Sequence, residues 1–196
     1  MSPIFCLVTD RRRYGAAWEP ALVERVAAAA REGVHLVQIR ERDLDGGPLM
    51  RLVSGCVTAV RGTNTRIIVN DRLDVALAAC AHGVHLRADS FSAARARASA
   101  PPPFLIGRSV HSVADAVAAT RDNGVDYLTF GTVFASASKP GRKPAGLAAL
   151  AEVTHATPLP VLAIGGVTRG CIGDVLAAGA AGVAAISMFD TTGSVP

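Results

Sequence analysis

The chain has 196 residues, half of them hydrophobic and 18% charged, so it can build a sizeable core as one domain over residues 1–196 without disulfides or metal ions. Its net charge of +4 either serves solubility or indicates a small anionic ligand. The absence of a basic stripe with interleaved aromatic residues argues against a nucleic-acid partner, and the absence of a long apolar run argues against a membrane partner. We therefore expect a cytoplasmic protein.

The four cysteines stand apart in apolar or helical contexts and form no CxxC pair with metal-binding spacing. We expect all four, Cys6, Cys56, Cys80 and Cys171, to be buried free thiols. The histidines form no HxH or HExxH motif, so a transition-metal site is not expected.

Short apolar runs alternate with helical patterns along the whole chain. Strands are predicted, in chain order, at Ile4–Val8, Val34–Ile39, Arg66–Val69, Gly83–Leu86, Phe104–Gly107, Val125–Gly131, Val161–Ile164 and Ala181–Ile186. Helices are predicted between them at Pro20–Arg31, Pro48–Arg61, Asp71–Cys80, Ser92–Ala98, from Ser112 onward, at Gly146–His155 and at Arg169–Ala178. The third helix would place Leu73, Ala76, Leu77 and Cys80 on one apolar face.

This strict alternation leaves two α/β folds, an open doubly wound sheet or a (β/α)8 TIM barrel. Eight short strands fit the barrel better. The chain ends in a polar tail at 190–196, so the last helix of the barrel is expected to be short or missing. Either the chain is truncated there or a partner subunit, as in a homodimer, covers that flank.

Polar residues follow most of the predicted strands, and the carboxyl ends of barrel strands are where TIM barrels carry their chemistry. The pair Gly165–Gly166 follows the seventh strand, and Ser187 follows the eighth. Glycines let backbone N–H groups approach an anion closely, so we expect a phosphate to bind there; the alternative is a simple tight turn.

Arginines and a carboxylate follow the second and third strands. Gln38, Arg40 and Arg42 alternate, so all three can face one side and contact phosphate, although a solvated charged loop is the alternative. Asp71, after Asn70, could hold Mg²⁺ with ligand phosphates, or one of the pair could cap the following helix.

Two further segments carry candidate chemistry. His111, just past the fifth strand and close to Ser109, can exchange a proton near neutral pH, or can be a structural histidine. Histidines inside strands, such as His85, are less promising. Lys139 lies with Ser136 and Ser138 in a long loop after the sixth strand, where a lysine can close over a phosphate.

As a set, these segments resemble the thiamine phosphate synthase/TenI family over almost the whole chain. The matching stretches are Gln38-Ile39-Arg40-Glu41-Arg42, Val69-Asn70-Asp71-Arg72, Gly83-Val84-His85-Leu86, Gly107-Arg108-Ser109-Val110-His111-Ser112, Asp126 to Gly131 with Lys139, and Ala163-Ile164-Gly165-Gly166.

The resemblance implies thiamine biosynthesis and one of two activities. Thiamine phosphate synthase joins hydroxymethylpyrimidine diphosphate to thiazole phosphate and releases pyrophosphate, with Mg²⁺ as cofactor. In that case the pyrimidine diphosphate would contact Gln38, Arg40, Asn70, Ser109 and Lys139, with Arg42 where the synthase usually has lysine. Asp71 would be one magnesium ligand, and Gly166, Ile186 and Ser187 would hold the thiazole phosphate.

One departure favours the other activity. The synthase has an aspartate as second magnesium ligand where this chain has Ser90, with Asp89 one residue early. TenI proteins share the Ser90-Phe91-Ser92 segment; TenI is a thiazole tautomerase that aromatises carboxythiazole phosphate, uses a histidine matched by His111, and needs no metal. We therefore expect the tautomerase first and the synthase as the alternative. A non-catalytic protein that binds a phosphorylated ligand is the third reading.

Overall fold

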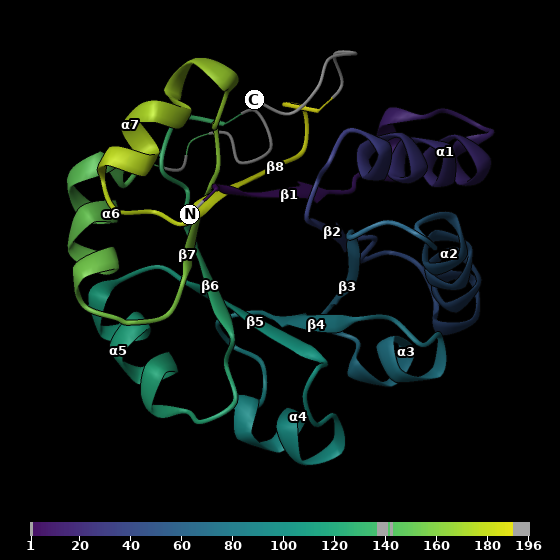
Figure 1. The fold of residues 1–196 in the computed structure, drawn as a ribbon, viewed down its shortest axis with the longest axis horizontal. Helices are drawn as coiled ribbons and strands as arrows, with labels where there is room; N and C mark the ends of the chain where they lie inside the picture. The colour runs from purple at the N-terminus through teal and green to yellow at the C-terminus, as the bar shows by residue number, and fades with distance from the viewer. Residues whose placement is uncertain (1, 137–140, 142, 190–196) are drawn as a thin grey trace.

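The computed structural model describes residues 2–136, 141 and 143–189. Eight parallel strands close into a barrel in chain order, with β8 pairing back onto β1, which confirms the predicted (β/α)8 fold (Figure 1). The strands are β1 (Ile4–Val8), β2 (Leu36–Ile39), β3 (Arg66–Asn70), β4 (Gly83–Leu86), β5 (Leu105–Val110), β6 (Tyr127–Gly131), β7 (Val161–Ile164) and β8 (Gly182–Ala185).

Helices form an outer ring that runs clockwise from α1 to α7 in Figure 1. They are α1 (Trp18–Arg31), α2 (Gly46–Ala59), α3 (Leu73–Ala78), α4 (Ala93–Ser99), α5 (Val113–Arg121), α6 (Gly146–His155) and α7 (Ile172–Ala177), with short 3₁₀ turns at Arg11–Arg13 and Arg169–Cys171. No helix follows β8 as far as Phe189, where the described chain stops, as the sequence pattern predicts.

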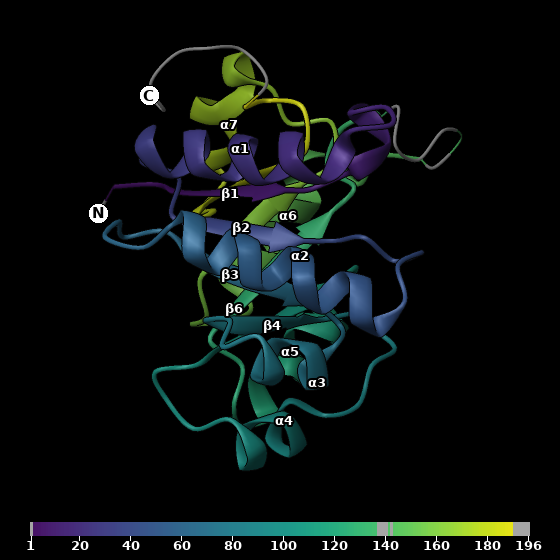
Figure 2. The same ribbon diagram turned by 90° about the vertical axis from the view of Figure 1, so that its right-hand side faces the viewer.

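Side chains alternate between the two surfaces of the barrel because successive strand residues point to opposite sides. Residues such as Val37, Val69 and Leu128 pack outward into the large core beneath the helices. Residues such as Cys6, Ile68 and Leu162 form a smaller apolar cluster inside the barrel. Figure 2 shows the barrel from the side, with α1 and α2 in front of their strands.

The third helix departs from the prediction. It begins at Leu73 and ends at Ala78, so it is shorter than the predicted span from Asp71 to Cys80. Leu77 is 41% exposed, whereas Val75, Ala76 and Ala79 are buried. The predicted apolar face is right at Ala76, which is buried, and at Leu73, which packs against the core, and it is wrong at Leu77 and Cys80. Cys80 has left the helix for a left-handed backbone conformation with a φ of 52°.

The prediction of four buried thiols is half right. Cys6 and Cys56 are buried, and burial raises the pKa of each thiol to about 12. Cys80 is exposed and Cys171 is partly exposed, because both lie at helix ends rather than in the core.

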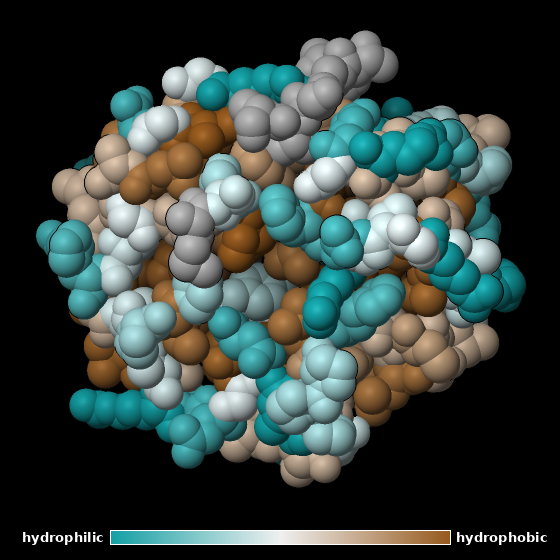
Figure 3. Space-filling view, viewed as in Figure 1, coloured by the Kyte–Doolittle hydropathy of each residue, from teal (hydrophilic) through white to brown (hydrophobic). Residues whose placement is uncertain are grey.

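No helix within the described residues is long and apolar enough to cross a membrane. In the view of Figure 3, hydrophilic residues are spread over the whole visible face, with hydrophobic residues between them.

Candidate functional site

Five consecutive strands, β2 to β6, place a polar side chain inside the barrel toward its carboxyl end. The alternation that points Leu36 and Ile68 into the interior cluster also points inward the polar residues farther along the same strands. These inward polar residues are Gln38, Asn70, His85, Ser109 and Thr129. Gln38 Nε2 donates to Asn70 Oδ1 over 3.1 Å, so the amide N–H groups of Asn70 stay available to an acceptor.

His85 connects the side chains of this layer, although the sequence pattern did not single it out as a site residue. Its Nε2 lies 2.9 Å from Ser109 Oγ and 3.2 Å from Thr129 Oγ1, and its Nδ1 lies 3.2 Å from the Tyr127 hydroxyl. Burial lowers the pKa of His85 to about 4; Asp71 opposes this shift, whereas Arg40 and Arg108 add to it. A neutral His85 therefore positions Ser109 and Thr129.

The lowered pKa of His85 predicts an acid-sensitive fold. Between pH 6.5 and about 4 the unfolded chain binds a proton at this histidine and the folded chain does not, so stability falls as the pH falls. The slope from this one group is about 1.4 kcal/mol per pH unit. Urea unfolding at several pH values should show a weaker pH dependence for His85→Asn than for the unaltered chain. Equal dependence in both would refute this role.

The segment after β2 is anchored by buried polar contacts. The Arg40 backbone N–H donates to Thr9 Oγ1 over 3.0 Å, and Thr9 in turn donates to the carboxylate of Glu41. Glu41 is 5% exposed and also accepts the Arg11 backbone N–H over 3.0 Å. The alternative of a fully solvated charged loop is therefore wrong at Glu41. Burial, and to a smaller extent the charge of Arg42, lowers the pKa of the half-buried Arg40.

Asp71 does not cap the next helix. The residue before α3 is Arg72, and no side-chain oxygen caps that end, so the capping alternative is wrong for both Asn70 and Asp71. Asp71 has a left-handed φ of 64°, and its backbone N–H donates to the His85 carbonyl over 2.9 Å. Ser90 donates to the Asp71 carboxylate. The Asp71 side chain is thereby fixed at the mouth of the barrel, beside β4.

The paired glycines have the backbone geometry that their position requires. Gly165 and Gly166 have φ values of 97° and 66°. A Cβ on Gly166 would lie 2.3 Å from the Ala135 carbonyl oxygen and 2.8 Å from the Phe134 carbonyl carbon. Glycine is therefore needed for a tight turn against the loop after β6. Ile186 and Ser187 follow β8; Ile186 is partly buried and Ser187 is exposed.

His111 is held at the end of β5. Its Nδ1 donates to the Gly131 carbonyl oxygen over 2.8 Å, and its backbone N–H donates to Asp115 Oδ2 over 2.9 Å. The ring is exposed, and this contact leaves Nε2 as the nitrogen able to accept a proton. Ser136 is partly exposed after β6, whereas Ser138 and Lys139 lie outside the described residues.

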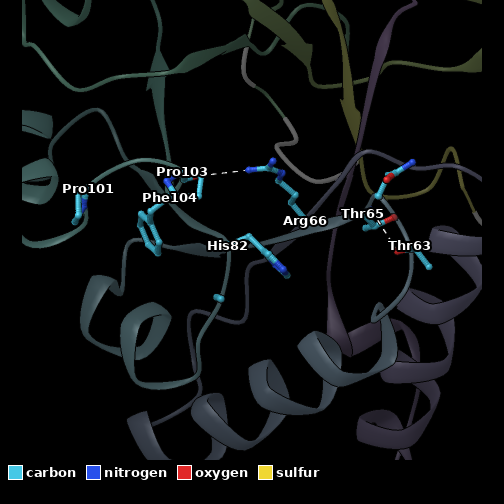
Figure 4. A pocket seen from close by; sticks show the side chains of 9 residues that line it. Thr63, Thr65, Arg66, His82, Pro101, Pro103 and Phe104 are labelled. Atoms are coloured by element: carbon cyan, nitrogen blue, oxygen red, sulfur yellow. Dashed lines mark hydrogen bonds between the residues drawn. The ribbon is translucent and has the colours of Figure 1, made fainter.

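A hollow of about 500 Å³ opens at the other end of the barrel (Figure 4). Thr65 and Arg66 at the start of β3, His82 before β4, and Pro103 and Phe104 before β5 contribute to its lining. These residues stand at the amino ends of their strands, which TIM barrels use for stability rather than chemistry. The candidate site is therefore the carboxyl end.

Known proteins resemble the chain along nearly its full length. The family model described as thiamine monophosphate synthase matches residues 5–189. A thiamine-phosphate synthase of Methanoculleus marisnigri is 45% identical over 172 residues, which cover 87% of this chain and 80% of that protein. A putative thiamine-phosphate synthase 2 of Aquifex aeolicus is 35% identical over 95% of this chain and 97% of its own.

A solved structure agrees with these sequence matches. The thiamine phosphate pyrophosphorylase of Pyrococcus furiosus superposes with a TM-score of 0.81 at 31% identity, covering 94% of this chain and 85% of that one. Fold and sequence therefore point to the same relatives.

Proposed function

The chain belongs to the thiamine monophosphate synthase family, and from this membership we propose that it joins hydroxymethylpyrimidine diphosphate to thiazole phosphate, with release of pyrophosphate. Membership makes it an enzyme of thiamine biosynthesis. The observation that carries the finer assignment is the 45% identity to a thiamine-phosphate synthase over 87% of the chain. The expectation that placed the tautomerase first is not supported by these relatives, which favour the alternative.

The geometry at the carboxyl end suits a diphosphate leaving group. Arg40, half-buried between β2 and the barrel mouth, offers a planar guanidinium, and Asn70 offers amide N–H groups. When the bond between the pyrimidine methylene carbon and the diphosphate oxygen breaks, pyrophosphate leaves with the electron pair. The thiazole nitrogen supplies the electron pair for the new bond to that carbon. Donors fixed beforehand at that point stabilise the developing charge. In this proposal Gln38 and Ser109 orient the pyrimidine half.

The second substrate is assigned to the turn after β7 and the segment after β8. We assign the phosphate of the thiazole to the backbone N–H groups near Gly166 and Ser187, because a left-handed glycine turn exposes N–H groups to an anion. Ile186 would contact the thiazole ring. Ser136, Ser138, Lys139 and Arg42 would complete the binding of the diphosphate and phosphate groups.

The Mg²⁺ that the family resemblance implies does not fit the side chains present. Asp71 has a serine hydroxyl from Ser90 where the second carboxylate would stand. The Arg87 guanidinium lies 3.5 Å from the other carboxylate oxygen of Asp71. No group of three or more His, Cys, Asp or Glu side chains able to hold a metal occurs among the described residues. The roles proposed above depend on no metal ion.

Product analysis tests the proposed function. The purified protein, incubated with pyrimidine diphosphate and thiazole phosphate with and without Mg²⁺, should release thiamine phosphate and pyrophosphate in equal amounts. The same protein incubated with the unaromatised carboxythiazole phosphate tautomer should not accelerate its conversion. Aromatisation of the tautomer without synthesis of thiamine phosphate would overturn the proposal in favour of the tautomerase.

His111 discriminates the two activities. Joining the two substrates needs no proton shuttle, so His111→Asn should change the rate of thiamine phosphate formation by less than about 3-fold. A tautomerase that uses this histidine as general acid–base would lose roughly 10²–10⁴ in turnover. Steady-state rates of His111→Asn on both substrate sets decide between the two activities.

A further inference from the structure

Arg87 lies between two carboxylates just past the carboxyl end of β4. Its Nη1 is 3.5 Å from Asp71 Oδ2. Its Nε donates to Asp89 Oδ1 over 2.9 Å, and its Nη2 pairs with the other Asp89 oxygen. The side chain is 42% exposed, so the guanidinium is accessible to a ligand at the barrel mouth while it offsets the charge of Asp71.

Ser90 forms a hydrogen bond with the other carboxylate oxygen of Asp71. Its hydroxyl donates to Asp71 Oδ1 and accepts the Arg87 backbone N–H over 3.0 Å. Both carboxylate oxygens of Asp71 therefore have partners from the same turn. A hydroxyl lacks the charge that a second carboxylate would offer a divalent ion, and Mg²⁺ would have to compete with a guanidinium already in place.

The guanidinium keeps donors for a ligand. Arginine carries five N–H groups in a planar fork, and Asp89 accepts from Nε and Nη2. The remaining N–H groups lie in the same plane, and Arg carries its positive charge at every physiological pH. The Arg87 side chain, with a smaller contribution from Arg42, lowers the pKa of Asp89, so the exposed Arg42 adds positive charge on this side.

We propose that Arg87 takes the part of a divalent cation at this site, neutralising Asp71 and binding the diphosphate directly, so that diphosphate binding requires no Mg²⁺. The inference rests on the proposed function, because it assigns the diphosphate of that reaction to this end of the barrel. Guanidinium and diphosphate form charge-assisted, bidentate hydrogen bonds without a bridging ion.

Calorimetric titration with inorganic pyrophosphate, in EDTA and in excess MgCl₂, tests this role. The unaltered chain should bind in EDTA with a Kd within about 3-fold of its value with Mg²⁺. Arg87→Ala should raise the Kd in EDTA by about 10-fold or more, the loss expected for charged hydrogen bonds. Arg72→Ala is the matched control, since Arg72 makes the same paired contact with Asp74 and should leave the Kd unchanged within about 2-fold.

A gain-of-dependence variant makes the test two-sided. Ser90→Asp restores a second carboxylate beside Asp71 and should make pyrophosphate binding Mg²⁺-dependent by about 10-fold or more. The inference is overturned if the unaltered chain binds pyrophosphate only with Mg²⁺, if it does not bind at all, or if Arg87→Ala binds as the unaltered chain does. Product formation that needs Mg²⁺ would overturn the role of Arg87 and leave the proposed function standing. Metal-free pyrophosphate binding without formation of thiamine phosphate would leave the role of Arg87 standing and overturn the proposed function.

Discussion

Arg40→Ala should lower kcat/KM for thiamine phosphate formation by about 10²-fold, because a charged hydrogen bond to the leaving pyrophosphate stabilises it by roughly 1.5–3 kcal/mol. Arg40 is half-buried with a lowered pKa, and no carboxylate of the described residues forms an ion pair with its guanidinium. Asp10 and Glu41 act on it only through their charge, so a bound anion would be its direct partner. Arg40→Lys should recover part of the rate, since lysine retains the charge and loses the bidentate geometry.

The control for Arg40 is another arginine near the carboxyl end. Arg12 is exposed, and it pairs with Asp10 over 2.7 Å. Arg12→Ala makes the same change in charge and should alter kcat/KM by less than about 3-fold. Steady-state kinetics with both substrates varied measure the difference. Equal losses in the two variants would mean that Arg40 contributes only to the general positive potential.

Arg97→Ala should lower the free energy of unfolding by about 2–4 kcal/mol, through the loss of several charged hydrogen bonds to partly buried acceptors. From α4, Arg97 donates to the carbonyls of Ala100, Phe104 and Gly124 over 3.0, 2.6 and 2.8 Å. It also pairs with Asp126 over 2.6 Å, and Asp126 accepts the Ile106 backbone N–H. One side chain therefore ties α4 to the starts of β5 and β6.

Arg95 supplies the control for this stability effect. It lies two residues away on the same helix and is exposed, so Arg95→Ala should change the unfolding free energy by less than about 0.5 kcal/mol. Urea denaturation at pH 7 measures both variants. An Arg97→Ala protein as stable as Arg95→Ala would show that the strand starts hold together without this arginine.

The barrel was predictable because each strand is a short buried run between glycine, proline or helical patterns. Gly83–Leu86 and Val161–Ile164 match the prediction residue for residue. Helix bounds were less predictable, since the left-handed conformation of Asp71 delays α3, and aspartate adopts that conformation only occasionally.

The residues of the inner layer were only partly predictable. Strand alternation from Leu36 and Ile68 to Gln38 and Asn70 was enough to place those side chains in the barrel. The same reasoning applied to β4 would have identified His85. A histidine within a strand is, however, interpreted as structural when the side chains around it are unknown. Its contacts come from β5 and β6.

The contact between Arg87 and Asp71 could not be predicted from the sequence. The two residues directly follow adjacent strands, β3 and β4, and their distance depends on the loop after β4, where Ser90 contacts both. The substitution at position 90 could be seen in the sequence and favoured the tautomerase. What could not be seen is that a guanidinium stands beside the remaining carboxylate.

A crystal structure of the protein with thiamine phosphate and pyrophosphate would test most directly whether the carboxyl end of the barrel is the active site. The account predicts the phosphate of thiamine phosphate at the N–H groups of Gly166 and Ser187, and pyrophosphate against Arg40 and Asn70. Products bound in the hollow at the amino end, around Arg66 and His82, with the carboxyl end empty at saturating concentrations, would contradict it.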